Sequence, residues 1–197
     1  MIITAADLSL LCQIELNCKK CIRACLYFDA VSGSDDNMWA FAQNCFGESA
    51  ILHWSKSFAS WKEPTHFTRF FAGKSFKMPD GLTLTLEIVR SRLYAAAMMS
   101  ADEYFACWKN LKRGRDKYFV HSDFSTAGRL HFPGLDVLRR VALEMRNMIH
   151  DVIVNAESED VERHKTFKDL VQWNRNDKYL RDIEEDCQRL KRMMKPE

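Results

Sequence analysis

The segment that decides the fold is Leu11–Phe28, which reads LCQIELNCKKCIRACLYF. Its apolar residues recur at alternating steps of three and four, which is the spacing that places them on one face of a helix. These residues are Leu11, Ile14, Cys18, Cys21, Cys25 and Phe28. The segment predicts a helix from about Ala5 to Phe28 with one buried face, in which the cysteines behave as small hydrophobes.

The same cysteines raise the alternative of a zinc site, because Cys18 and Cys21 are separated by two residues and Cys25 follows. A structural zinc site usually needs four ligands, and the remaining cysteines are scattered singly. The total of seven is also odd for a disulfide framework. We therefore expect no metal site and no other cofactor.

A second helix is predicted after the turn-forming run Ser32–Asp36. It ends near Phe58 and carries Met38, Phe41, Cys45 and Leu52 on one face. Two consecutive amphipathic helices with a short connection should pack as an antiparallel pair.

The segment Trp61–Gly81 is irregular, with phenylalanines interleaved among basic residues. Aromatic rings among cations can stack nucleobases and hold phosphates. The alternative is a long connection whose phenylalanines pack under the bundle, and we favour it because apolar side chains are usually buried. The residues concerned are Phe67, Phe70, Phe71 and Phe76, with Arg69, Lys74 and Lys77.

Helical periodicity returns over Leu82–Ala97, and Ser100–Glu103 has the pattern of a capping box that begins another helix. A further helix is expected from near Leu135 to about Val154, followed by one or two charged peripheral helices. The sequence thus predicts an all-α antiparallel bundle over residues 1–156, with a long irregular connection. We expect residues 157–197 to form a charged C-terminal helical extension packed on the same domain.

Composition fits one substantial core, because 47% of the 197 residues are apolar. No apolar run approaches the roughly 20 residues that span a bilayer, and the first residues lack the features of a signal peptide. We therefore expect a cytoplasmic protein without a membrane partner. The formal charge of +2 does not indicate a nucleic-acid partner by itself.

The distribution of charge is more informative, because basic residues gather around one short run. Arg115, Asp116 and His121 lie within it. Arginine binds phosphate through a forked set of donors, and histidine moves protons near neutral pH. The neighbouring cations would attract RNA; they are Lys109, Lys112, Arg113 and Lys117.

Structural roles remain open for the same residues. Arg115 can pair with a carboxylate of the bundle, Asp116 can pair with a neighbouring lysine, and His121 can cap a helix end. A second arginine and histidine, Arg146 and His150, are four residues apart on one helix face, and we interpret them as an intrahelical polar pair.

The run Leu111–Asp123 resembles the HEPN superfamily, whose pattern is an arginine, four to six residues, and then a histidine. Here five residues separate Arg115 from His121. The run is more narrowly similar to the abortive-infection AbiU-type branch, and Ile51–Phe58 is similar to the apolar-Trp-Lys-Phe segment of that branch. The likeness covers residues 10–155. Asp123 stands where some HEPN proteins have a tyrosine, so regulation by nucleotide transfer to that position is not expected.

The resemblance implies a homodimer in which motifs from two subunits form a metal-independent endoribonuclease, in a toxin or antiphage defence role, with a protein antitoxin or regulator as a further partner. It also leaves open a non-catalytic module that binds RNA or protein. Along a straight helix, Arg115 and His121 would be ~9 Å apart in rise and ~120° apart in direction. One helix therefore does not focus both on one phosphate. In the catalytic hypothesis His121 is the general acid or base, Arg115 stabilises the phosphorus oxygens, and Asp116 orients them.

Overall fold

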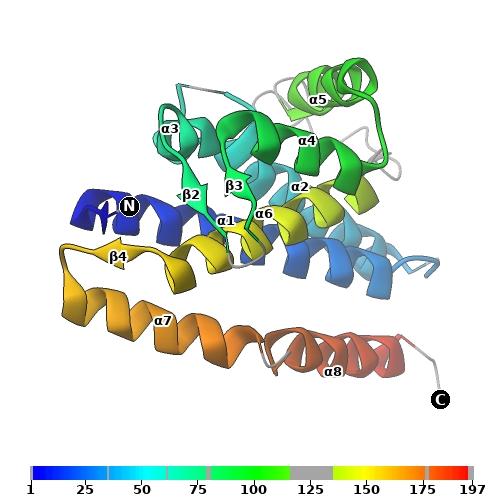
Figure 1. The fold of residues 1–197 in the computed structure, drawn as a ribbon. Coiled ribbons are helices and arrows are strands. Elements are labelled where there is room, and N and C mark those ends of the chain that lie inside the picture. Colours follow the sequence, from blue (N-terminus) through cyan, green and yellow to red (C-terminus); the bar gives the residue numbers. More distant parts are fainter. Residues whose placement is uncertain are drawn as a thin grey trace.

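The computed structural model describes residues 2–34, 36–60, 62–78, 81–115, 135–175 and 178–194. Over these residues the fold is all-α, as the sequence predicts, and each strand is only two residues long. The helices form three layers (Figure 1). The central layer contains α1 (Ala5–Ala30), α2 (Asn37–Phe58) and α6 (Leu135–Asn155). One side carries α3 (Phe67–Phe71), α4 (Leu86–Ala97) and α5 (Ala101–Gly114), and the other side carries α7 (Val161–Arg175) and α8 (Lys178–Met193).

Helix α1 confirms the prediction made from its apolar seam. It begins at a capping box, in which Thr4 and Asp7 exchange hydrogen bonds between side chain and backbone. Five residues of the seam are at most 1% exposed, and these are Leu11, Ile14, Cys18, Cys21 and Cys25. The cysteines are free thiols in the core. Within the described ranges, no group of three or more histidine, cysteine or acidic side chains could hold a metal ion.

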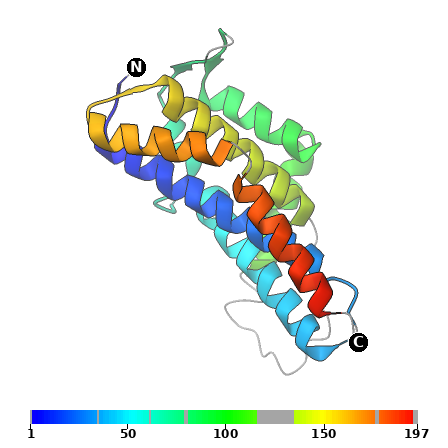
Figure 2. The same cartoon turned by 90° about the horizontal axis from the view of Figure 1, so that it is seen from below.

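Helix α2 runs back along α1, and the two lie side by side in both views (Figures 1 and 2). Its buried face is not the one that the sequence suggests. Met38, Phe41 and Leu52 are 62%, 65% and 48% exposed. The face turned to α1 contains Gly47, Ala50 and Trp54. Small residues on that face let the two backbones approach, so the larger apolar face of α2 is left outside.

The phenylalanines of the irregular connection are buried, which confirms that they pack under the bundle. Phe67, Phe70, Phe71 and Phe76 are between 0% and 7% exposed. Beyond α3, β2 (Phe76–Lys77) and β3 (Thr83–Leu84) form an antiparallel pair. Two residues are too short to produce a recognisable alternation, so the sequence does not predict this pair. Helix α4 accordingly begins at Leu86, whereas the periodicity had suggested Leu82.

Helix α6 lies at the centre of the molecule and contacts α1, α2, α4 and α7. The apolar residues expected to face the core are buried, and they are Leu138, Ala142, Met145, Ile149 and Ile153. After α6 the chain forms β4 (Glu157–Ser158), which pairs in parallel with β1 (Ile2–Ile3). The two peripheral helices α7 and α8 then follow, as predicted. None of the described helices is long and apolar enough to cross a membrane.

Candidate functional site

Helix α5 carries the described residues of the basic run. The side of α5 that faces the bundle attaches the helix to it. It begins at the expected capping box, in which Glu103 N donates to Ser100 Oγ at 3.3 Å and Ser100 N donates to Glu103 Oε2 at 2.8 Å. Near its other end Leu111 is 3% exposed. Between them Trp108 Nε1 donates a hydrogen bond of 2.9 Å to the carbonyl oxygen of Phe58, at the end of α2. The indole ring is therefore held in one orientation.

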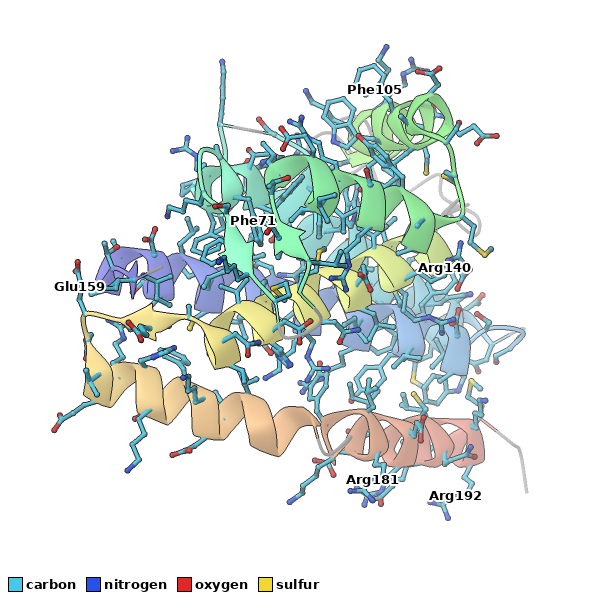
Figure 3. The ribbon with its side chains drawn as sticks, in the orientation of Figure 1. Phe71, Phe105, Arg140, Glu159, Arg181 and Arg192 are labelled. Carbon is cyan, nitrogen blue, oxygen red and sulfur yellow. The ribbon has the colours of Figure 1, made fainter. Side chains whose placement is uncertain are left out.

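The outer face of α5 presents the ring of Phe105, which lies against the half-buried ring of Trp108, and a lysine lies over each ring. Phe105 is 52% exposed, and Figure 3 shows it pointing away from the bundle. Its ring stacks on that of Trp108, with centroids 5.4 Å apart and 9° between the planes. Lys109 Nζ lies 4.4 Å from the Phe105 ring centroid, and Lys112 Nζ lies 5.5 Å from the Trp108 centroid. Each lysine is four residues beyond its ring, which places it on the same helix face.

Arg115 lies at the end of this face. It is the C-cap of α5, and its backbone N–H contacts the carbonyl oxygens of Leu111 and Lys112. Seven residues of helix place it ~10 Å beyond Trp108 along the axis and only ~20° around it. The side chain of Arg115 is half-buried. Arg113 and Lys109 are exposed.

The remaining residues of the predicted motif, which are Asp116, Lys117 and His121, lie outside the described residues. The structure therefore places Arg115 together with Lys109, Lys112 and Arg113 on one helix. Phe105 belongs to the same face and was not anticipated from the sequence. The signal that could have identified it is the spacing Phe105, Trp108, Lys109 and Lys112, which repeats at three and four.

A second polar cluster lies in the core between α1 and α6. The carboxylate of Glu15 lies 3.3 Å from His150 Nε2, 3.5 Å from Arg146 Nε and 3.1 Å from Lys19 Nζ. The side chains of Arg146 and His150 are only 6% and 2% exposed. Arg146 and His150, which the sequence suggested as an intrahelical pair, thus both contact Glu15 on α1. The sequence pattern of α6 alone does not indicate this contact.

Glu15 is ionised in this cluster. Burial by itself would raise its pKa, but the hydrogen bond with His150 and the charge of Lys19 outweigh burial, so the pKa lies below its ordinary value. An ionised carboxylate is the partner that a buried guanidinium requires.

Two other described histidines and two of the cysteines have structural environments. His66 caps α3, and His164 Nε2 lies 2.8 Å from the carbonyl oxygen of Ile153. Burial raises the pKa of the Cys12 thiol to about 12 and also raises the pKa of Cys18. These two residues are therefore thiols near neutral pH and lack the thiolate that nucleophilic catalysis uses.

No protein-family model, curated protein or solved structure matches this chain. The relation to the HEPN superfamily remains a prediction that depends on Leu111–Asp123 and Ile51–Phe58.

Proposed function

We propose that this protein binds single-stranded RNA along the outer face of α5. The observation that carries the proposal is the exposed ring of Phe105, which stacks on the half-buried Trp108, with Lys109 and Lys112 over the two rings. Proteins that bind single strands combine aromatic rings, on which bases stack, with cations that follow the phosphates. The HEPN resemblance points to the same class of ligand.

The cations alone would not support this function. Lysine and arginine near the C-terminus of a helix interact favourably with the helix dipole, so Lys112 and Arg113 have a structural reason to be there. The helix dipole does not explain the position of Phe105, which is uncharged. Packing explains it only in part, because a half-exposed aromatic ring contributes less to the core than a buried one. A ligand that stacks on the ring would account for its exposure.

In the proposed binding mode, an RNA base replaces Lys109 on the ring of Phe105. A base that stacks on Phe105 takes the ring face that Lys109 covers. An exposed cation–π contact is worth only about 0.5–1 kcal/mol, so the lysine can move aside. Its ammonium group then becomes available to the adjoining phosphate. The strand would continue toward Arg113 and Arg115 at the end of the helix.

The test is the affinity for a labelled single-stranded RNA, measured by fluorescence anisotropy. Phe105→Ala should weaken binding by about tenfold, because one stacked base is worth about 1–3 kcal/mol. Phe105→Leu should weaken it nearly as much, since leucine is apolar but has no flat π-face. Lys109→Ala should also lower the slope of log K against log salt by about 0.7, the value for one phosphate contact on a single strand.

Lys165→Ala serves as the matched control, because Lys165 is an exposed lysine on α7. It should leave both the affinity and the salt slope unchanged. A duplex of the same sequence should bind more weakly, because its bases are already stacked. Wild-type affinity in Phe105→Ala would contradict the proposal.

Cleavage of the bound RNA is a second candidate function, favoured by the position of Arg115 two turns beyond Trp108 on the proposed binding face. In this mechanism His121 removes the proton from a ribose 2′-hydroxyl, and the oxygen attacks the adjacent phosphorus. The bond from phosphorus to the 5′-oxygen of the next nucleotide breaks, and that oxygen takes a proton from water. Arg115 stabilises the charge on the phosphorus oxygens and Asp116 orients these groups. The products are a 2′,3′-cyclic phosphate and a 5′-hydroxyl.

Cleavage is tested by incubating a defined RNA with chelator and comparing wild type with His121→Ala and Arg115→Ala. Both variants should lose cleavage while keeping the binding that depends on Phe105. Equal cleavage by all three proteins would exclude these residues from the chemistry. RNA binding without cleavage by the wild type would identify a non-catalytic binding module.

A second copy of this chain is the partner we propose for α2. Met38, Phe41 and Leu52 are exposed on its outer face, and Cys45 is also exposed there. The steps from 38 to 41, 45 and 52 follow the heptad spacing by which helices pair. A dimer would also bring a second set of motif residues to the first, which the separation of Arg115 and His121 along one helix requires. A toxin or antiphage defence role and an antitoxin partner are proposals from the HEPN resemblance alone.

A further inference from the structure

Helix α8 lies over basic side chains of α1 and α6, two of which, Lys19 and Arg146, also contact the Glu15 carboxylate. Figures 1 and 2 show α8 lying across α1, on the side of the molecule opposite α5. Tyr179, which is 8% exposed, lies with its ring against three basic side chains. The ring centroid is 5.4 Å from Lys19 Nζ, 5.5 Å from Arg23 Cζ and 5.4 Å from Arg146 Cζ.

The contacts of α8 resemble those that a nucleotide would make. A ring held against guanidinium groups and an ammonium is the arrangement in which unstacked bases bind to proteins. Two turns after Tyr179, the carboxylate of Asp186 accepts a hydrogen bond of 2.9 Å from the hydroxyl of Tyr27 on α1. That hydroxyl could equally donate to a phosphate oxygen. An aromatic ring and an anion on α8 thus occupy neighbouring positions on one surface.

Few side chains attach α8 to the bundle. Tyr179 and Ile183 are its two buried residues, and Cys187 adds a contact of 3.6 Å to the carbonyl oxygen of Leu26. The opposite face of the helix is charged, and Figure 3 shows Arg181 and Arg192 pointing away from the bundle. An element with so few buried apolar contacts belongs to the part of a protein that opens locally before the core does.

We propose that the surface of α1 and α6 beneath α8 is a second binding site for single-stranded RNA, and that α8 occupies this site until it is displaced. A base takes the place of the Tyr179 ring against Arg23 and Arg146, and a phosphate takes the place of the Asp186 carboxylate. The site shares no residue with α5, so its test is independent of the function proposed for that helix.

The experiment uses the full chain with Tyr179→Ala and Ile183→Asp combined, and a labelled 20-nucleotide uridine oligomer as the probe. Hydrogen exchange of peptides from α8 reports whether the helix has detached. We expect faster exchange in α8 and an affinity that rises by about tenfold, with a strong dependence on salt. The gain should persist when Phe105→Ala is added, because the second site does not involve α5.

Arg23→Glu in the released protein should abolish the gain, because Arg23 lies against the Tyr179 ring at the exposed edge of this surface. Lys165→Glu, an equal change of charge on the exposed face of α7, should leave the gain intact. Fast exchange without a gain in affinity would overturn the proposal. Continued protection of α8 in the double variant would also overturn it, since the helix would then not be held by Tyr179 and Ile183.

Discussion

At the scale of single residues, Glu15 joins α1 to α6 in the core. Its carboxylate contacts Lys19 on its own helix and Arg146 and His150 on α6. A buried ion pair adds little stability compared with well-packed apolar residues, but removing one partner leaves an uncompensated charge in the core. The main effect of losing the Glu15 carboxylate would therefore be an uncompensated positive charge in the core.

We predict that Glu15→Gln lowers the free energy of unfolding by about 3 kcal/mol, measured by urea denaturation at pH 7. Because the folded pKa of Glu15 is lowered, the contribution of its charge is complete above the unfolded pKa of ~4.3 and disappears as pH falls through the folded value. The difference between the two proteins should thus shrink in acid. Glu144→Gln is the control, since its ion pair with Arg92 is partly exposed and should be worth less than about 1 kcal/mol. Equal losses in the two variants would show that burial of Glu15 is unimportant.

His66 should make stability depend on pH above the range of Glu15. Burial lowers its pKa to about 4, and the contact of Nε2 with the carbonyl oxygen of Phe58 opposes this shift only in part. The neutral ring accepts a hydrogen bond from Thr68 N. Its contribution is complete above the unfolded pKa of ~6.5 and is lost as pH falls toward 4. The cost at pH 5 is about 2 kcal/mol. His66→Gln should reduce the fall in unfolding free energy between pH 7.5 and 5 by that amount, and an unchanged fall would contradict the assignment.

At the scale of elements, the turn between α4 and α5 combines strain with compensation. Met98 ends α4 with φ of 58°, the left-handed region that glycine favours, and its side chain is 75% exposed. Arg140 of α6 donates hydrogen bonds of 2.9 Å and 3.2 Å to the carbonyl oxygens of Ala96 and Ala97. These bonds satisfy carbonyl groups that a helix end leaves open.

Met98→Gly should raise the free energy of unfolding by about 0.5–1 kcal/mol, because glycine adopts this conformation without a steric penalty. The gain should appear as a higher urea midpoint with an unchanged slope. Met98→Ala is the control: it removes the exposed side chain but keeps a β-carbon in the left-handed region. If alanine stabilises as much as glycine, the effect comes from the side chain and the strain is absent.

The elements also show where sequence reasoning succeeds. Helix α1 could be predicted because it has a single apolar seam, so periodicity and burial agree. Helix α2 has two apolar faces, and the larger of these, with Met38 and Phe41, is the exposed one. Periodicity cannot rank two such faces, because the choice depends on how closely Gly47 and Ala50 let α1 approach. The strands β2 and β3 are two residues long each, which is too short to leave an alternating pattern in the sequence.

At the scale of the whole molecule, the candidate sites also differ in whether the sequence could predict them. Lys109, Lys112, Arg113 and Arg115 could be identified because they are neighbours in sequence. The cluster around Glu15 could not, because Arg146 lies 131 positions away in the chain and meets it only after α6 packs on α1. Tyr179 joins the same cluster from a helix whose pattern indicates only a narrow apolar stripe.

The outer face of α2 leads to the last prediction, which concerns assembly. A two-fold axis near Cys45 would place Met38 of one copy beside Leu52 of the other, since these residues lie seven positions to either side. Such a self-complementary contact gives a closed dimer. The wild type should sediment as a dimer and Phe41→Asp as a monomer, whereas Ile88→Asp, on the exposed face of α4, should leave the dimer intact. A short bismaleimide should cross-link wild-type chains but not Cys45→Ser chains. If the wild type sediments as a monomer at every concentration tested, the exposed face of α2 does not pair two copies, and cleavage by a composite site loses its structural basis.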